Sequence, residues 1–193
     1  TARIMTLIGC CALMANLAAY MAVKSRQGFV PFLTSTQDLL PQRALTGTSI
    51  ARLPDGVVRR ELATFIERLR SIPADRVVLR RDVSRLFTFL ANTTSAERKV
   101  KEYMEDKQQT PQAFLGRLTR TVDVTSVVFR GGDSWLVEWR ETVQPLVGGE
   151  PTSGLYQATL TIGEAEPQDP DALAVNPFGL FVRDYTISYL GAD

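Results

Sequence analysis

The pattern of apolar positions separates an uncharged N-terminal segment from a longer stretch with amphipathic periodicity. Ile4–Val23 is a run of twenty residues without a charged side chain. A helix of that length rises about 30 Å, the thickness of a bilayer's hydrocarbon core. Arg3 precedes the run, and Lys24 and Arg26 follow it, as is typical of basic side chains at membrane interfaces. We therefore expect residues 1–26 to form a single transmembrane anchor.

Small residues follow one stripe of this expected helix, with an asparagine beside them. They are Ala12, Ala15, Asn16, Ala19 and Ala22. Small side chains let membrane helices approach closely, and an amide can hydrogen-bond to a neighbouring helix. The stripe is therefore a candidate surface for packing against another membrane helix. The alternative is that alanine is simply common in such helices.

After the anchor, residues 27–53 are rich in glycine, proline, serine and threonine. This composition predicts a linker, with one short strand at Phe29–Leu33. The remaining residues, 54–193, form the predicted folded domain.

Apolar residues at helical spacing predict three helices in the first half of this domain. They run from about Asp55 to before Pro73, over Asp75–Ala91, and from Thr94 to about Lys107. Thr94 and Glu97 fit a capping box, in which each side chain accepts a hydrogen bond from the other residue's backbone N–H.

Beyond Pro111 the apolar period changes from 3.6 to 2, which predicts strands. They are Thr121–Arg130, Ser134–Val143, Leu155–Ile162 and about Leu180–Leu190. In the first of them, the expected common face holds Val122, Val124, Ser126 and Val128. Helices followed by hairpin-linked strands predict an α+β fold, with the helices packed on one face of an antiparallel sheet.

One acidic residue falls on an apolar face of the second predicted strand. Glu141 shares that face with Trp135, Val137 and Trp139, whereas Glu138 lies on the opposite face. A carboxylate inside an apolar cone can act as a general base. The alternative is that Glu141 sits at the strand end, solvated or paired with an arginine.

The composition of the chain excludes several kinds of active site and metal site. The 193 residues include no histidine, which excludes Ser-His-Asp catalysis and imidazole zinc sites. The two cysteines, Cys10 and Cys11, are adjacent, so they form neither a zinc set nor a disulfide framework. We expect no cofactor and no metal site.

The charges nearly balance, with 22 basic and 21 acidic residues. Eight arginines and four acids lie between Arg59 and Arg85. Such a run can meet phosphates or anionic lipid headgroups, but the interleaved acids favour a solvated helix face. No direct contact with nucleic acid is expected.

The order of these features resembles a known family. The segments that carry the resemblance are Val30-Pro31-Phe32, Phe65–Arg70, Ser134–Glu141 and Asn176–Val182. Together they are similar to the TrbF conjugal-transfer proteins and their relatives, inner-membrane assembly components of bacterial type IV secretion systems. The Asn-Pro-x-Gly signature at Asn176–Gly179 is the most specific part of the match.

The resemblance implies a nuclear-transport-factor-2-like domain, a cytoplasmic N-terminus, a periplasmic C-terminal domain and no enzymatic activity. It also implies self-association, membrane attachment through the N-terminal helix and contacts with other secretion subunits. The positive-inside rule gives the opposite orientation, because two basic residues follow the anchor and one precedes it.

The signature also has a direct physical interpretation. Pro177 biases Asn176 toward extended geometry, and Gly179 permits a backbone conformation that other residues resist. The tetrapeptide Asn176, Pro177, Phe178 and Gly179 is therefore either a rigid turn before the last strand or an interface that presents Phe178 to a partner.

Two functions are the main competitors, and a lipid- or DNA-contacting module that uses the Arg59–Arg85 run is a third. The first is a non-enzymatic scaffold of a conjugative type IV secretion system, for which Glu141→Gln should leave plasmid transfer largely intact. The second is a membrane-anchored enzyme of the isomerase or dehydratase type, which would need Glu141 in a closed pocket.

Overall fold

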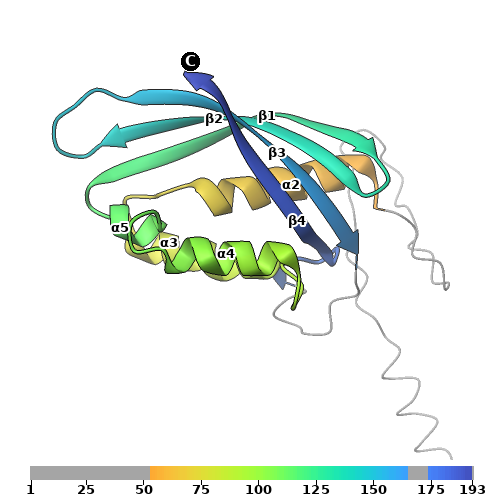
Figure 1. Cartoon of the computed structure of the whole chain (residues 1–193). Helices are drawn as coiled ribbons and strands as arrows, with labels where there is room; N and C mark the ends of the chain where they lie inside the picture. Colours follow the sequence, from red (N-terminus) through yellow and green to blue (C-terminus); the bar gives the residue numbers. More distant parts are fainter. Residues whose placement is uncertain (1–52, 165–173, 193) are drawn as a thin grey trace, which may run out of the picture. The chain divides into compact units, whose positions relative to one another are not determined.

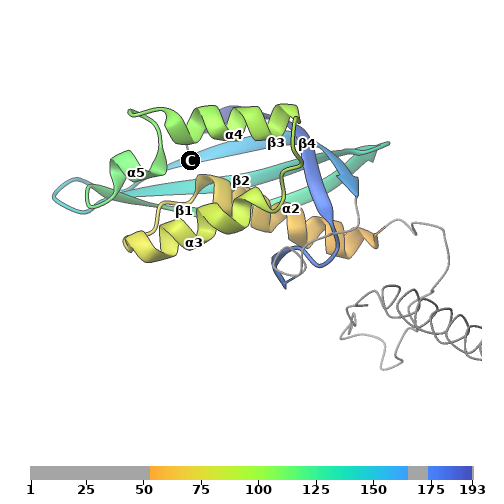
Figure 2. The same ribbon diagram turned by 90° about the horizontal axis from the view of Figure 1, so that it is seen from below.

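The computed structural model describes residues 53–164 and 174–192 of the chain. Its helices are α2 (Asp55–Arg70), α3 (Arg76–Phe87), α4 (Ser95–Glu105) and α5 (Pro111–Phe114), and its strands are β1 (Leu118–Gly131), β2 (Ser134–Pro145), β3 (Thr152–Glu164) and β4 (Leu180–Ala192). Helices α2, α3 and α4 lie on one face of the sheet (Figures 1 and 2). The expected α+β arrangement is therefore confirmed.

The expected anchor, its alanine stripe, the linker and the strand at Phe29–Leu33 all fall outside the described residues. Among residues 53–164 and 174–192, no helix has the length and apolar character to cross a bilayer.

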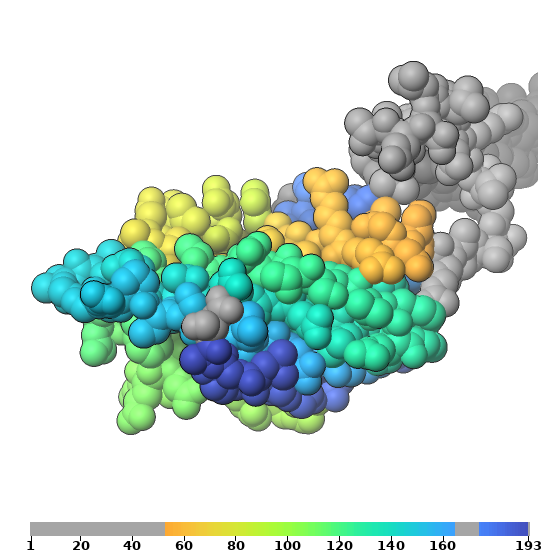
Figure 3. Space-filling view, turned by 90° about the horizontal axis from the view of Figure 1, so that it is seen from above, coloured from red at the N-terminus to blue at the C-terminus, as the bar shows by residue number. Residues whose placement is uncertain are grey.

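The sheet has the order β1-β2-β3-β4, and every neighbouring pair is antiparallel. Its opposite face, away from the helices, is seen in Figure 3. A tight turn at Gly132, where φ is +58°, joins β1 to β2. This positive φ strains other residues, so glycine fits the turn.

The core lies between the sheet and α2. Leu62, Phe65 and Ile66 on α2 are fully buried, as are Trp135 and Val137 on β2. Fully burying one such side chain contributes about 1.5–3 kcal/mol. Periodicity placed both apolar faces correctly, because α2 and β2 keep a regular phase throughout.

In strand β1 the alternation of side chains between the two faces of the sheet is interrupted. Register shifts interrupt its pairing with β2 between Val124 and Ser126. After this bulge Val127 and Phe129 pack against the core, whereas Val128 is 41% exposed. The expectation that Val128 shares the face of Val122 is wrong, because one extra residue turns the following side chains to the other face.

Helix α3 ends at Phe87, four residues before the predicted end at Ala91. The backbone N–H groups of Phe89 and Leu90 bond three residues back, to Leu86 and Phe87. The carbonyl oxygen of Phe89 then accepts a hydrogen bond of 2.8 Å from the Val182 N–H of β4. Pairing with the sheet edge therefore replaces the last helical turn.

Of the two hydrogen bonds in the predicted capping box of α4, only one is confirmed. The Thr94 Oγ1 accepts a hydrogen bond of 3.2 Å from the Glu97 N–H. The Glu97 carboxylate accepts a hydrogen bond of 2.8 Å from Thr93 rather than from Thr94, whose own N–H donates to Ala91. Thr93 has a φ of +66°, which turns its N–H toward the helix.

The short helix α5 was not predicted, and β1 begins at Leu118, three residues earlier than expected. Pro111 supplies the fixed φ that favours a first helical position. Four residues are too few to produce a visible apolar period, so sequence patterning misses such a turn.

Candidate functional site

The carboxylate of Glu141 lies at the centre of a polar cluster within the apolar face of β2. Glu141 is only 2% exposed. Its Oε1 accepts hydrogen bonds from Arg70 Nε at 2.6 Å and from Trp139 Nε1 at 2.9 Å. Its Oε2 accepts a third, from Arg70 Nη2 at 3.0 Å. The paired alternative in the sequence analysis is therefore the correct one.

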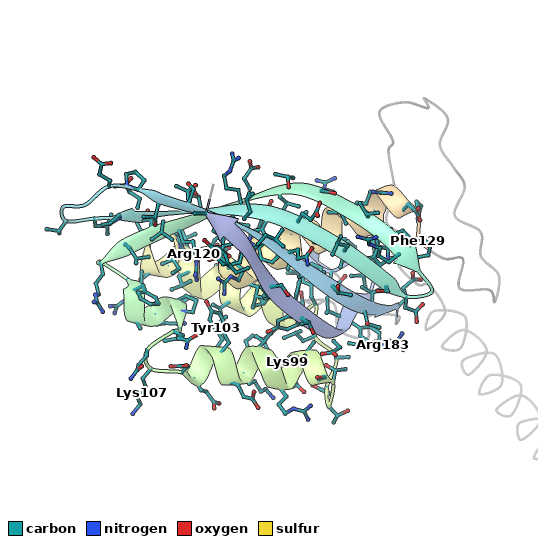
Figure 4. All side chains as sticks on the ribbon, turned by 45° about the horizontal axis from the view of Figure 1, so that its top comes forward. Lys99, Tyr103, Lys107, Arg120, Phe129 and Arg183 are labelled. Atoms are coloured by element: carbon teal, nitrogen blue, oxygen red, sulfur yellow. The ribbon has the colours of Figure 1, made fainter. Side chains whose placement is uncertain are left out.

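A second arginine completes the cluster. Arg120 Nη1 lies 3.6 Å from Glu141 Oε2. Arg120 also donates from Nε to the Arg70 carbonyl at 2.6 Å and from Nη2 to the Tyr103 hydroxyl at 3.0 Å. Figure 4 places Arg120 on the helix side of the sheet, above Tyr103 of α4. Arg70 of α2 and Arg120 of β1 thus meet at the carboxylate of β2, and Tyr103 of α4 contacts both arginines.

The neighbours of Arg70 stabilise its positive charge. Burial alone would lower the pKa of Arg70, but the hydrogen bond and negative charge of Glu141 outweigh burial and raise that pKa above its ordinary value. The guanidinium also lies 5.7 Å from the ring centre of Tyr156 and 5.9 Å from that of Tyr103. Such aromatic faces attract a cation.

Beside Glu141 the concave face of the sheet opens into a hollow of about 310 Å³. Tyr156 and Tyr189 line it, with ring centres 5.1 Å apart, and Tyr156 stacks on Trp139. Gly154 lies under the two tyrosines, where an added Cβ would come within 2.9 Å of the Tyr189 ring. The backbone is therefore kept free of a side chain at the floor of the hollow.

The partners of Glu141 limit its chemistry. A general base needs a free lone pair facing the proton that it removes. Both oxygens of Glu141 instead accept bonds from Arg70, and one of them also accepts from Trp139. This geometry suits a carboxylate that attaches α2 to the sheet. It leaves Glu141 poorly placed to remove a proton from a molecule in the hollow.

The Asn176–Gly179 segment forms a tight turn before β4. The Asn176 side-chain amide donates to the carbonyl of Thr88 at 2.9 Å and to that of Leu180 at 2.7 Å. The Gly179 N–H bonds to the Asn176 carbonyl at 3.1 Å, and Gly179 has a φ of +60°. Asn176 is 4% exposed, whereas Pro177 and Phe178 are half-buried. Asn176 thus joins the end of α3 to the start of β4.

The arginine run between Arg59 and Arg85 does not form one face. Arg70 is paired with Glu141, Arg59 donates to the Val127 carbonyl and lies over Trp135, and Arg68 lies over the ring of Phe89. Four arginines of α3 remain exposed, and they are Arg76, Arg80, Arg81 and Arg85. The structure therefore leaves one compact basic face on α3, and Arg60 is exposed separately on α2.

The residues that complete the Glu141 cluster were not predicted from the sequence, although two charged ones left a signal. Val58, Leu62 and Ile66 are spaced by four residues, and Arg70 continues that buried stripe. Arg120 likewise precedes Val122 and Val124 at a spacing of two. A charged residue in phase with an apolar stripe indicates a buried partner. Tyr156 likewise shares the strand phase of Ala158 and Leu160, which are buried.

Fold and site together define a class of α+β domain whose buried polar groups hold its elements in place. The chain belongs to the VirB8 protein family, because the model of that family matches residues 1–189. It is also 27% identical over 129 residues to a conjugal transfer protein TrbF from Rhizobium radiobacter. That match covers 67% of this chain and 58% of the relative.

Solved structures share the fold at low sequence identity. The VirB8 protein of Agrobacterium tumefaciens aligns with a TM-score of 0.63 and 17% identity, over 72% of this chain and 96% of that one. A TrwG component of a type IV secretion system from Bartonella birtlesii aligns with a TM-score of 0.64 and 14% identity, over 71% of this chain and 93% of that one. The helices and the four-stranded antiparallel sheet match these structures.

Proposed function

We propose that this chain is a non-enzymatic scaffold of the inner-membrane complex of a conjugative type IV secretion system. The observation that carries the proposal is the VirB8 family match over residues 1–189. The similarity to a relative named as a conjugal transfer protein supports plasmid transfer as the process in which the chain acts. The chain links the inner-membrane platform to the periplasmic channel through self-association and contacts with other subunits.

In this proposal the chain has three parts. Residues 1–26 form the anchor with a cytoplasmic N-terminus, residues 27–53 form the linker, and residues 54–193 form a periplasmic domain. The stripe that begins at Ala12 and ends at Ala22 packs against other membrane helices. The uncharged run Ile4–Val23 supports the anchor.

The Glu141 cluster supports a scaffold over the isomerase or dehydratase alternative. Both carboxylate oxygens are bound by Arg70, and a second arginine stands beside them. A catalytic base would need this arrangement to open. The cluster instead fixes the position of α2 against the sheet, so that the surfaces of the domain keep one geometry.

The Asn176–Gly179 turn is the proposed contact with partner subunits. The Asn176 amide donates to two backbone carbonyls, so it serves the turn itself. Pro177 and Phe178 are half-buried, and their remaining surface is available to a partner. An aromatic side chain on a rigid turn is a typical interface anchor, because it binds without ordering a flexible segment.

The test combines a deletion strain with complementation and purification from gently solubilised membranes. The wild-type chain should restore plasmid transfer and recover channel subunits and ATPases of the transfer system. Phe178→Glu should lose both, whereas Val147→Glu, on a residue 89% exposed at the β2–β3 turn, should retain both. Normal transfer in the deletion strain would contradict the scaffold role, and normal transfer with Phe178→Glu would contradict the interface.

A further inference from the structure

We propose that the exposed arginine face of α3 binds the anionic phosphate headgroups of the membrane to which the chain is anchored. The face consists of Arg76, Arg80, Arg81 and Arg85, with Val77 among them. The inference rests on the proposed membrane anchor. It adds a second, peripheral membrane contact, made by the folded domain.

The first observation is the placement of the four arginines. At 100° per residue, positions 76, 80, 81 and 85 span about half of the helix circumference. All four side chains are exposed. Within residues 53–164 and 174–192, the one ion pair of this face joins Arg81 to Asp82 at 3.6 Å, and Arg81 stays 55% exposed. The face therefore presents nearly its full positive charge to solvent.

The second observation is an apolar side chain within the charged face. Val77 is 71% exposed, on the side of α3 away from its buried residues Leu79 and Leu86. An exposed apolar side chain beside arginines is typical of helices that lie at a bilayer surface, where headgroups and acyl chains meet. The phosphate backbone of a nucleic acid would satisfy the arginines and leave Val77 in water.

The third observation is the reach of the chain. In the sequence, the proposed linker between the anchor and the folded domain has 27 residues. Helix α2, with 16 residues, rises about 24 Å, and α3 then runs back beside it (Figure 2). An anchored chain therefore carries α3 on the same polypeptide as its membrane helix, which raises the effective concentration of headgroups for α3.

The rest of the domain leaves α3 free for this contact. Helix α2 lies against the sheet, while α3 lies on the outer side of the helix layer (Figure 1). Arg70 and Arg68 of α2 are held by Glu141 and by the ring of Phe89. In the part of the chain that the structure describes, the arginine side chains of α3 form no hydrogen bond or ion pair with the sheet, so binding a headgroup breaks no interaction of the core.

The test uses the full chain reconstituted in vesicles, with Cys10→Ala and Cys11→Ala and an environment-sensitive fluorophore on Val77→Cys. One set of vesicles contains phosphatidylcholine alone, and the other contains phosphatidylcholine mixed with phosphatidylglycerol. We expect a blue-shifted emission, quenched by lipid-borne quenchers, in the mixed vesicles alone. Raising NaCl from about 0.1 M to about 1 M shortens the Debye length from about 10 Å to about 3 Å and should abolish the shift.

Charge variants supply the matched control. Each arginine near an anionic surface contributes about a fivefold gain in binding, so replacing Arg76, Arg80 and Arg85 by glutamine should reduce the docking constant about a hundredfold. Replacing the exposed Arg98, Arg117 and Arg130 by glutamine removes the same charge elsewhere and should leave the shift intact. Hydrogen exchange of residues 76–87 in the unlabelled chain gives a second readout, since docking slows exchange.

The outcomes separate this inference from the proposed function. A chain released from membranes by carbonate contradicts the anchor and therefore both proposals. An anchored chain with no shift, or with the same shift in both kinds of vesicle, overturns the headgroup contact alone. Protection of 76–87 by an oligonucleotide or by polyglutamate, but not by phosphatidylglycerol, also overturns it, because the face then serves another polyanion.

Discussion

The guanidinium of Arg70 donates two hydrogen bonds, of 2.6 and 3.0 Å, to the carboxylate of Glu141, although the two residues are 71 positions apart in the chain. This pair joins the last turn of α2 to the centre of the sheet. Because Glu141 is buried, breaking the pair leaves a charge without its partner inside the domain. Replacing one member of a buried pair commonly costs 3–5 kcal/mol.

Glu141→Gln is therefore expected to lower the free energy of unfolding by about 3 kcal/mol. The glutamine oxygen still accepts from Trp139, but Arg70 and Arg120 lose their counter-charge. Denaturant unfolding of the purified domain measures the change. The control variant Glu138→Gln, on the opposite face of β2, should change stability by less than about 0.5 kcal/mol. Plasmid transfer should fall only as far as the amount of folded protein falls.

A double-mutant cycle separates the pair from its surroundings. Arg70→Met with Glu141→Gln should be more stable than the sum of the single changes predicts, with a coupling of at least about 1 kcal/mol. Strictly additive free energies would mean that the two side chains do not stabilise each other.

Asn176 is expected to stabilise the domain whether or not the turn is an interface. Asn176→Asp removes the amide donors to Thr88 and Leu180 and places a carboxylate against two carbonyl oxygens, so it should cost more than Asn176→Ala. Loss of the buried hydrogen bonds in the alanine variant should cost about 1–3 kcal/mol. Thermal unfolding ranks the variants, and equal stability of all three proteins would contradict the hydrogen bonds.

Burial raises the pKa of Glu61 above its ordinary value, against the attraction of Arg68 and Arg60. The folded state therefore takes up a proton more readily than the unfolded state. This group contributes stability below its unfolded pKa, and the contribution disappears as the pH rises through the folded pKa. Glu61→Gln should accordingly be more stable than wild type at pH 7 and should lose that advantage near pH 4.

The measurement is the melting temperature of both proteins between pH 4 and pH 7. Glu105→Gln, on the exposed side of α4, serves as the control for removing one negative charge. An advantage of Glu61→Gln that grows as the pH falls would contradict the direction of the shift.

Burial raises the pKa of Tyr185 to about 12, with smaller contributions from Tyr103 and from other groups. Its ring lies against Phe65 of α2 and beneath Lys99 of α4. Ultraviolet titration at alkaline pH should show one tyrosine that ionises near pH 12, and Tyr185→Phe should remove this ionisation step. The stability contributed by the neutral phenol is present below pH 10 and is lost as the pH rises through 12. Ionisation of every tyrosine near pH 10 would contradict this burial.

The sequence alone determined the three longer helices, the four strands and most of the core of this domain. The stripe of α2 and the alternation of β2 predicted Leu62, Ile66, Trp135 and Trp139 as buried, and all four are. These predictions succeed because the period of an apolar pattern is a local property of a regular helix or strand. The order of segments likewise placed the chain near the TrbF proteins, and the VirB8 family match confirms that resemblance.

Only the tertiary structure decided the phase of β1 and the partners of the charged residues. One bulge reversed the side chains after Val124, which no composition rule marks. The pairing of Glu141 with Arg70, rather than with any other arginine, depends on how α2 lies across the sheet. Long-range contacts are set by the packing of whole elements, so the same packing that buried Arg70 left the arginines of α3 on the surface.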